Sequence, residues 1–263
     1  MTTKTIVLFD MDGTLTPARK PADPSMGKIL FKLSQHAKIG IVTGSGFDYL
    51  MQQCDCAELG VPVDKAFLLP CNGTKFYAWK EREWELQHSV DMREKLGNKH
   101  FDLLMKILIG AQFTHISTEP DHPLTGHFIS YRDSMINWCP VGRNANSEQR
   151  NSFIEYDQRT EMRFRLMTGV QAMVDKIMGE GTVQFALGGN TSIDIYPTGW
   201  DKTYALKHFP GHECWFVGDR CGPTGNDRQI YELLAKENRG FKTTGPENTI
   251  EITSQIIKKL QPQ

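Results

Sequence analysis

The 263-residue sequence contains no run of apolar residues approaching the 18 or so that a membrane-spanning helix needs. Residues 1–4 also lack the long apolar stretch of a secretory signal peptide, so we expect a cytoplasmic protein without a membrane partner. The formal net charge is only −1, from 30 Lys and Arg against 31 Asp and Glu, which gives no general attraction for nucleic acid. Any positively charged binding site must therefore be local.

Paired cysteine motifs are also missing. The six cysteines are scattered without CxxC spacing, which argues against both a disulfide framework and a zinc site. The eight histidines are equally dispersed, and none pairs with an acid at the spacing of metal ligands. We expect reduced thiols and ordinary surface or core histidines.

Strand and helix signals alternate over the first and last thirds of the chain. This alternation is typical of a parallel sheet with helices on both faces. Between the two stretches the pattern changes to long helical segments, at about 91–109 and 147–178, with short strands. We therefore predict an α/β fold, with a doubly wound, mainly parallel sheet in a core domain (1–86 and 190–263) and an inserted α+β cap domain (87–189). The second part of the core is expected to begin with a helix from residue 201.

The most informative segment is the apolar run that begins at Thr5 and ends in Asp10-Met-Asp12-Gly13-Thr14. It predicts a buried strand that delivers two carboxylates to a glycine turn. In extended backbone, side chains at i and i+2 point the same way, and two close carboxylates repel each other unless a cation lies between them. Magnesium favours such oxygen ligands, and a carboxylate can also attack phosphorus. A solvated turn is the alternative for this motif alone.

Further polar residues follow other predicted strands. In open α/β sheets the ligand lies outside the carboxyl ends of the strands, so these residues are site candidates. A Thr43-Gly-Ser45-Gly loop leads into a helix, whose free N–H groups favour an anion. Each motif alone also fits an ordinary turn, helix cap or surface charge. The remaining candidates are Lys202, Asp219 and Asp227.

Taken together and in this order, these motifs resemble the haloacid dehalogenase superfamily. The resemblance implies a phosphorylated nucleophile at Asp10 and a general acid/base at Asp12. It also implies that Ser45 (or Thr43) and Lys202 hold the phosphoryl oxygens. Phosphoryl transfer independently requires positioning and neutralisation of spread negative charge, which a metal, a lysine and loop N–H groups supply. The implied ligands for Mg²⁺ are Asp10, Asp12, Asp219 and Asp227.

Longer strings resemble the eukaryotic-type phosphomannomutase family, which has a type IIB-like cap. They recur in order from about residue 5 to 245, at 10–19, 132–143, 147–150, 188–202 and 218–227. The resemblance implies a homodimer through the cap domain. It also implies interconversion of mannose 6-phosphate and mannose 1-phosphate through a hexose 1,6-bisphosphate, which would supply GDP-mannose synthesis.

A bisphosphate intermediate presents each of its phosphates to Asp10 in turn, so the distal phosphate needs its own anion site. Arginine suits this task because its planar fork binds phosphate with two hydrogen bonds. A surface ion pair is the alternative for any one arginine. The resemblance places Arg19, Arg132, Arg143 and Arg150 on the substrate phosphate, and Ser192 and Asp194 on the sugar hydroxyls.

The sequence departs from the family pattern at three places. Thr43-Gly-Ser45 replaces Gly-Gly-Ser and keeps a hydroxyl, whereas Cys71 replaces a glutamate. Asp133-Ser134 replaces Asn-Gly in the predicted cap. The alternatives to a mutase are a sugar-phosphate phosphatase, in which water attacks the aspartyl phosphate, and a non-catalytic phosphosugar-binding protein. The sequence does not separate mannose from glucose phosphates.

Overall fold

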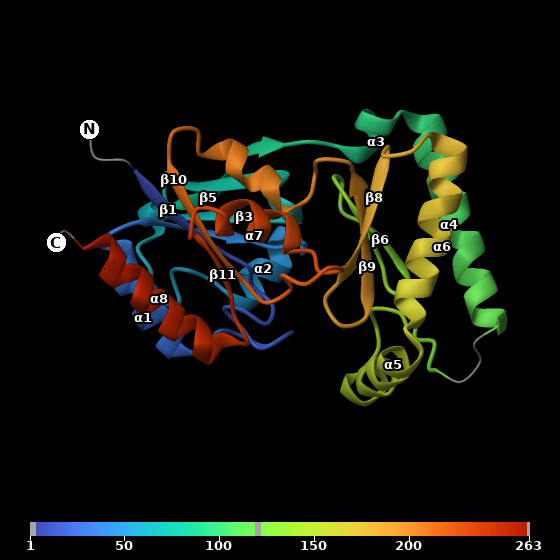
Figure 1. The fold of residues 1–263 in the computed structure, drawn as a ribbon, viewed down its shortest axis with the longest axis horizontal. Helices are drawn as coiled ribbons and strands as arrows, with labels where there is room; N and C mark the ends of the chain where they lie inside the picture. Colours follow the sequence, from blue (N-terminus) through green and yellow to red (C-terminus); the bar gives the residue numbers. More distant parts are fainter. Residues whose placement is uncertain (1–3, 119–121, 262–263) are drawn as a thin grey trace. The chain divides into compact units, whose positions relative to one another are not determined.

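The computed structural model describes residues 4–118 and 122–261, which form two compact units (Figure 1). The first unit contains the described residues of Met1–Ser89 and Trp200–Gln263, and the second contains those of Val90–Gly199. That the two units act as core and cap domains stays a prediction. None of the described helices combines the length and apolar character needed to cross a membrane.

The first unit is built on a seven-stranded sheet in the order β11-β10-β1-β2-β3-β4-β5. The first five strands in that order are parallel, and β4 and β5 form an antiparallel hairpin at one edge. This confirms the predicted fold class. The hairpin was not predicted: β4 has a short apolar run over residues 76–79, but β5 is mostly polar and largely exposed. The strands are β1 (Thr5–Phe9), β2 (Lys38–Val42), β3 (Ala66–Leu69), β4 (Lys75–Lys80), β5 (Glu83–Ser89), β10 (Glu213–Gly218) and β11 (Gly240–Lys242).

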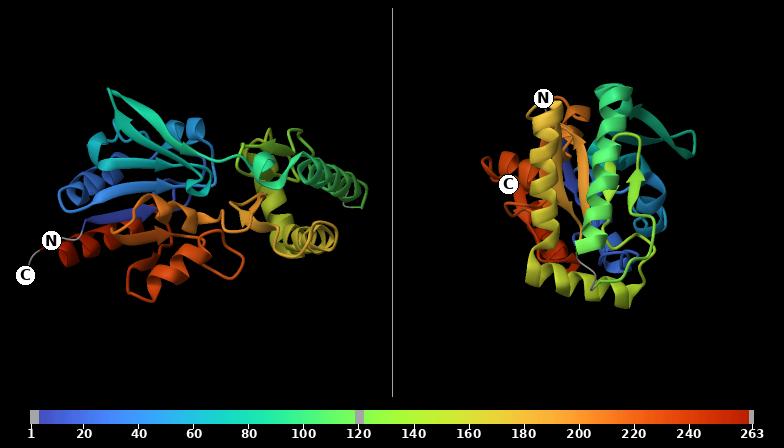
Figure 2. Two further views of the ribbon diagram at one scale, coloured as in Figure 1. Left: turned by 90° about the horizontal axis from the view of Figure 1, so that it is seen from above. Right: turned by 90° about the vertical axis from the view of Figure 1, so that its right-hand side faces the viewer.

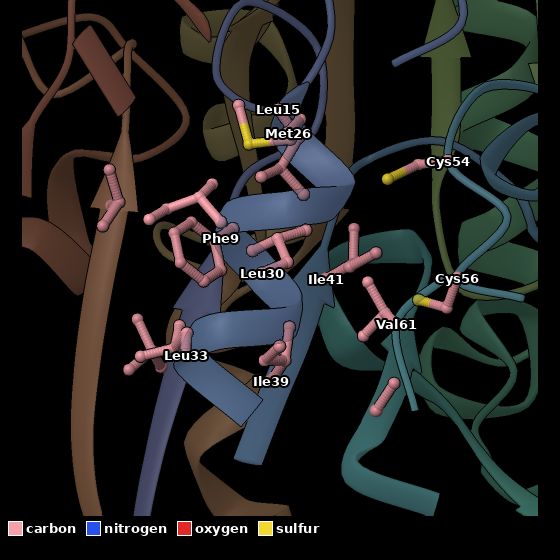
Figure 3. Close-up of a cluster of buried hydrophobic side chains, with 14 of the residues drawn as sticks. Phe9, Leu15, Met26, Leu30, Leu33, Ile39, Ile41, Cys54, Cys56 and Val61 are labelled. Atoms are coloured by element: carbon pink, nitrogen blue, oxygen red, sulfur yellow. The ribbon is translucent and has the colours of Figure 1, made fainter. Parts of the chain in front are cut away.

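Helices cover both faces of this sheet, so β1 is buried on both sides. Phe9 packs in a cluster with Leu30 (Figure 3), to which Val7 also belongs. Ile6 and Leu8 pack in another cluster with Ile230. This double burial explains the unbroken apolar run in β1. The first face carries α1 (Pro24–Ser34), α2 (Phe47–Gln53) and α8 (Pro246–Leu260), and the second carries α7 (Arg228–Ala235) and η3 (Lys202–His208).

The connections from β1 and from β10 therefore cross opposite faces of the sheet. Such a reversal opens a crevice at the carboxyl ends of the two neighbouring strands. The predicted helix from residue 201 is present as a 3₁₀ helix, Lys202–His208, which begins at an Asp201 cap. Two shorter 3₁₀ segments, η1 (Val63–Lys65) and η2 (Cys71–Gly73), flank β3.

The second unit has a four-stranded antiparallel sheet in the order β6-β7-β9-β8. Helices α4 and α6 run alongside each other, as Figure 2 shows. Strand residues alternate between the two faces, so Trp138 reaches Gln112 of α4 while Asn137 lies on the opposite face with Asp194. The elements are α3 (Met92–Leu96), α4 (Asn98–Thr118), β6 (Ile129–Tyr131), β7 (Ile136–Trp138), α5 (Ser147–Thr160), α6 (Met162–Met178), β8 (Val183–Gly188) and β9 (Ser192–Pro197).

The predicted helical segment at about 147–178 is helical throughout except at its break, where it divides into two separate helices, α5 and α6. Glu161 between them has a left-handed φ of 52°, and the chain changes direction there (Figure 2). The side chain of Asp157 accepts hydrogen bonds from the backbone N–H and the guanidinium of Arg163. This pair holds the start of α6 against the end of α5, a long-side-chain contact that the hydrophobic pattern does not encode.

Candidate active site

Three carboxylates meet at the carboxyl ends of β1 and β10. Asp10 follows β1 and is only 5% exposed, and Asp219 and Asp227 lie on the loop after β10. The Asp10 amide continues the parallel pairing by donating to the Val217 carbonyl at 2.9 Å. One oxygen from each carboxylate lies within 4.8 Å of the others. The structure therefore brings together three of the four predicted metal ligands.

Lys202 lies between two of these acids. Its Nζ donates to Asp10 Oδ1 and, at 2.5 Å, to Asp227 Oδ1, and the side chain is fully buried. Burial acts to lower the pKa of Lys202, but the two carboxylates outweigh it and raise that pKa. Lys202 is thus a fixed cation beside Asp10 and Asp227. Its predicted role in holding phosphoryl oxygens stays a prediction.

The acids themselves carry more negative charge than Lys202 balances. Burial raises the pKa of Asp10 well above its usual value, and the attraction of Lys202 only partly offsets this effect. Burial also raises the pKa of Asp219, and Asp227 adds to the shift. Both shifts mean that the site as described favours an additional positive charge near these carboxylates.

The oxygen donors of the site suit a hard divalent cation. Asp219 Oδ1 is buried and accepts no hydrogen bond from residues 4–118 or 122–261. Arg220 balances only part of the negative charge of these acids. Its Nε lies 3.7 Å from Asp219 Oδ2, and its backbone N–H donates to Asp227 Oδ2 at 2.9 Å. A buried oxygen without a donor, in an all-carboxylate set, fits Mg²⁺.

Two glycines make room for the acids. A Cβ on Gly13 would lie 2.5 Å from Asp219 Oδ2, and Gly13 also has a φ of 83°, which disfavours other residues. A Cβ on Gly218 would lie 2.6 Å from Asp227 Oδ2. The glycine of the Asp-Gly-Thr motif is therefore required by Asp219, on the loop after β10, as well as by its own turn.

Asp12 lies outside the group of three acids. Its Oδ1 accepts the backbone N–H of Arg19 at 3.0 Å, and the side chain is half-buried. Arg19 is exposed and has a left-handed φ of 62°. This contact orders the segment after the motif. The roles of Asp12 as acid/base and as metal ligand stay predictions, as does the phosphate contact of Arg19.

The loop after β2 carries the predicted phosphate ligands. Thr43 is buried and its Oγ1 accepts the Ser45 N–H at 3.1 Å, whereas Ser45 is half-buried. The η2 turn is joined to this loop, because Asn72 N–H donates to the Thr43 carbonyl at 2.8 Å. Asn72 was missed by sequence reasoning, although an Asn-Gly pair after a strand does predict a tight turn. Cys71, which replaces the family glutamate, is buried beside it.

In the second unit an amide joins two predicted substrate ligands. Arg143 Nη1 donates to Asn137 Oδ1 at 2.8 Å, and Asn137 Nδ2 donates to Asp194 Oδ1 at 2.7 Å. The amide orientation is fixed because arginine only donates and a carboxylate only accepts. A Cβ on Gly188 would lie 2.4 Å from Asp194 Oδ2. Asn137 is a second residue that sequence reasoning missed, since its role depends on strand pairing.

Three further predicted substrate ligands also lie in the second unit. Arg150 in α5 donates to Thr191 Oγ1 at 3.0 Å, next to the buried Ser192 at the start of β9. Arg132 is half-buried in the β6–β7 turn, where Asp133 has a left-handed φ of 65°. The three arginines come from three separate segments, and their convergence on one phosphate stays a prediction.

Comparison with known proteins agrees with the chemistry of the site. The family model described as eukaryotic phosphomannomutase matches residues 26–259. Phosphomannomutase from Encephalitozoon cuniculi is 34% identical over 261 residues, covering 98% of this chain and 95% of that protein. Phosphomannomutase from Saccharomyces cerevisiae is 33% identical over 260 residues, covering 97% and 94%.

Solved structures support the fold. The N-terminally truncated IMP-nucleotidase of Plasmodium falciparum has a TM-score of 0.65 at 13% identity, covering 98% of this chain and 71% of that one. Trehalose-6-phosphate phosphatase of Aspergillus fumigatus has a TM-score of 0.53 at 16% identity, covering 98% and 93%. At these identities the likeness concerns the fold alone, whereas the family match and the curated relatives extend over nearly the whole sequence. The chain belongs to the eukaryotic phosphomannomutase family.

Proposed function

We propose that this protein is a phosphomannomutase that interconverts mannose 6-phosphate and mannose 1-phosphate. The observation that carries the proposal is the buried group of Asp10, Lys202, Asp219 and Asp227 in a chain matched by the phosphomannomutase family model over residues 26–259. The group supplies a nucleophilic carboxylate beside a fixed cation, which is what transfer through an aspartyl phosphate requires.

In the proposed reaction a carboxylate oxygen of Asp10 attacks the phosphorus of a hexose 1,6-bisphosphate. The new bond joins Asp10 to phosphorus, and the bond from phosphorus to the sugar oxygen breaks. Asp12 gives its proton to the departing oxygen. In the other half-reaction, the hydroxyl at the other phosphate position of a hexose monophosphate attacks the phosphorus of the aspartyl phosphate. The bond from Asp10 to phosphorus breaks, and Asp12 takes the proton from that hydroxyl.

The surroundings of Asp10 suit this role. Lys202 holds Asp10 Oδ1, which fixes the rotation of the carboxylate, and the side chain is shielded from bulk water. Mg²⁺ would be held by Asp10, Asp219 and Asp227, with Asp12 as the further predicted ligand, and when bound it would neutralise charge on the transferred phosphoryl group. The N–H groups and hydroxyls of the Thr43–Ser45 loop would bind the phosphoryl oxygens.

The second unit would hold the end of the sugar that is not reacting. Arg132, Arg143 and Arg150, with Arg19 from the first unit, would bind the distal phosphate. Ser192 and Asp194 would bind sugar hydroxyls. The Arg143–Asn137–Asp194 chain supports this assignment, because it sets a phosphate ligand and a hydroxyl ligand in one hydrogen-bonded unit.

The proposal extends to partners and cellular role. The substrates would be hexose monophosphates and a hexose 1,6-bisphosphate in the cytoplasm, feeding GDP-mannose synthesis. A homodimer through the second unit is supported by large exposed apolar side chains on its two long helices: Ile109 and Phe113 on α4, and Met173 and Ile177 on α6. We expect sedimentation to give a dimer and Phe113→Ser to weaken it, and a monomeric wild-type protein would contradict the assignment.

A phosphorus NMR time course tests the activity. Mannose 1-phosphate is incubated with the protein, Mg²⁺ and a catalytic amount of glucose 1,6-bisphosphate, and the mannose 6-phosphate signal is expected to grow to a constant ratio. Release of inorganic phosphate alone would favour the sugar-phosphate phosphatase instead. Absence of any turnover would favour the non-catalytic phosphosugar-binding protein. A parallel course with glucose 1-phosphate measures the preference between the two sugars.

A further inference from the structure

We propose that Asn72 is a positioning residue, whose side chain holds the segment carrying Lys202 against the Thr43–Ser45 loop. Asn72 is 1% exposed and lies in η2, between β3 and β4. The inference rests on the proposed function in one respect, namely that Lys202 and this loop bind the transferred phosphoryl group. It assigns a role to a residue with no reacting atom of its own.

The backbone of the turn is unusual and is fixed to the phosphate loop. Cys71, Asn72 and Gly73 have successive left-handed φ values of 52°, 63° and 83°. Asparagine and glycine tolerate this region, whereas other residues adopt it only where the surroundings enforce it. Two hydrogen bonds enforce it here: Cys71 N–H donates to the Ser45 carbonyl at 2.9 Å, and Asn72 N–H donates to the Thr43 carbonyl at 2.8 Å.

The other side of the turn is fixed to the lysine segment. Asn72 Nδ2 donates to the Trp200 carbonyl at 3.2 Å, two residues before Lys202. The Gly73 carbonyl bonds to His208 Nε2 at 2.7 Å, at the end of η3. Gly73 also packs so closely on η3 that a Cβ there would lie 2.7 Å from Ala205 Cα. The turn therefore joins the phosphate loop to both ends of the segment that carries Lys202.

The lysine segment needs this support. η3 is a 3₁₀ helix of seven residues, and such helices have poorer hydrogen-bond geometry than α-helices. Its first turn is capped by Asp201, which accepts the Thr203 N–H at 2.8 Å. The Trp200 carbonyl immediately before this cap is bonded by Asn72. Loss of that bond would let the backbone of Lys202 shift. A shift of about 1 Å in a group that positions the substrate is enough to lower the reaction rate strongly.

Stability of the turn alone does not account for asparagine at this position. Asn72 Oδ1 is buried and accepts no hydrogen bond from the residues that the structure describes. A buried acceptor without a donor disfavours the folded state, and glycine would adopt the same φ without that cost. The amide is oriented by the Trp200 carbonyl, which can only accept. The side chain is thus explained by what its Nδ2 holds.

The test compares Asn72→Gly with Asn238→Gly. Asn238 has a similar φ of 58° but is exposed, so this control makes the same backbone change away from the site. For Asn72→Gly we expect kcat to fall on the order of tenfold or more, with a smaller rise in KM that reflects weaker phosphate binding. The melting temperature should stay near that of wild type, because one lost hydrogen bond is offset by removal of the buried Oδ1. Equal kcat in the two variants would overturn the proposal.

Two further readouts do not depend on mutase activity. In hydrogen exchange, amides of η3 should exchange faster in Asn72→Gly while those of α8 stay unchanged, and a uniform increase across the first unit would instead indicate a merely structural role. Calorimetry measures the affinity of each variant for inorganic phosphate. Asn72→Gly should weaken phosphate binding when introduced into the wild-type protein, but should cause no further weakening when introduced into Lys202→Met. Independent, multiplicative losses would contradict action through Lys202. A protein that binds phosphate but fails to isomerise mannose 1-phosphate would refute the proposed function while leaving these tests decisive.

Discussion

Gly13→Ala tests whether the space beside Asp219 is what the metal site requires. The new Cβ would lie 2.5 Å from Asp219 Oδ2 and 2.9 Å from its Cγ, so the carboxylate must move. Alanine at a φ of 83° also costs about 1 kcal/mol of folding free energy. The two effects are separable, because only the first changes the geometry of the three acids.

Gly60→Ala is the matched control. Gly60 has a φ of 71°, and apart from Gly60 and its two chain neighbours no heavy atom of the described residues lies within 4 Å of the Cβ that alanine would add. Both variants should therefore lose about 1 kcal/mol in urea unfolding. In Gly13→Ala the displaced Asp219 carboxylate should also weaken metal binding. Loss of a supporting contact at a metal site typically lowers metal affinity about 10-fold to 100-fold, and we expect a comparable loss here.

The assay is a titration with Mn²⁺, followed by paramagnetic resonance of the free ion, together with activity as a function of Mg²⁺ concentration. We expect Gly13→Ala to shift both midpoints upward on the order of 10-fold or more, and Gly60→Ala to leave them at the wild-type values. Identical metal midpoints for the two variants would refute the reasoning, because the Cβ added at Gly13 meets a predicted metal ligand, Asp219, whereas the one added at Gly60 does not.

Three further predictions follow from the same geometry. Asp10→Asn should abolish turnover and prevent acid-stable labelling of the chain by a phosphate donor, and unchanged turnover would remove Asp10 as the nucleophile. Arg143→Ala should reduce kcat/KM for mannose 1-phosphate by about one to two decades, corresponding to about 1.5–3 kcal/mol for a charged contact, but should spare hydrolysis of a small aryl phosphate. Equal losses on both substrates would contradict a distal phosphate site. Burial, with a smaller effect of His122, lowers the pKa of His115 to about 4. The unfolded chain therefore binds more protons between about pH 6.5 and pH 4, and the free energy of unfolding falls as the pH falls through that range. Urea unfolding should show a weaker pH dependence for His115→Gln than for the exposed-site control His36→Gln, and parallel curves would exclude His115 as the cause.

The predictable part of the fold and site depended on local patterns with strict geometric consequences. The buried run at Thr5–Phe9 predicted a central strand, and its neighbours in the parallel sheet followed from the alternation with helices. Because parallel strands end at the same edge, residues after different strands could be expected to meet, and Asp10, Asp219 and Asp227 do so. Lys202, at the start of η3, joins them.

The part that could not be predicted depended on contacts between distant segments. The break between α5 and α6 needs the Asp157–Arg163 pair, and the edge hairpin β4–β5 forms by pairing of half-exposed strands. The bond from Asn72 to the Trp200 carbonyl joins residues 128 apart in the sequence. No periodicity or spacing marks such a residue before the chain is folded.

The amino-acid sequence by itself determined the α/β class and the chemistry offered at the strand ends, because both follow from side-chain type and from the two-residue repeat of a strand. Only the tertiary structure decided which charged side chains lie beside one another, and which residues hold another side chain in place. Lys202 became a buried cation through Asp10 and Asp227, and Gly13 became necessary through Asp219, because burial and steric exclusion arise only where separate strands and loops are packed together.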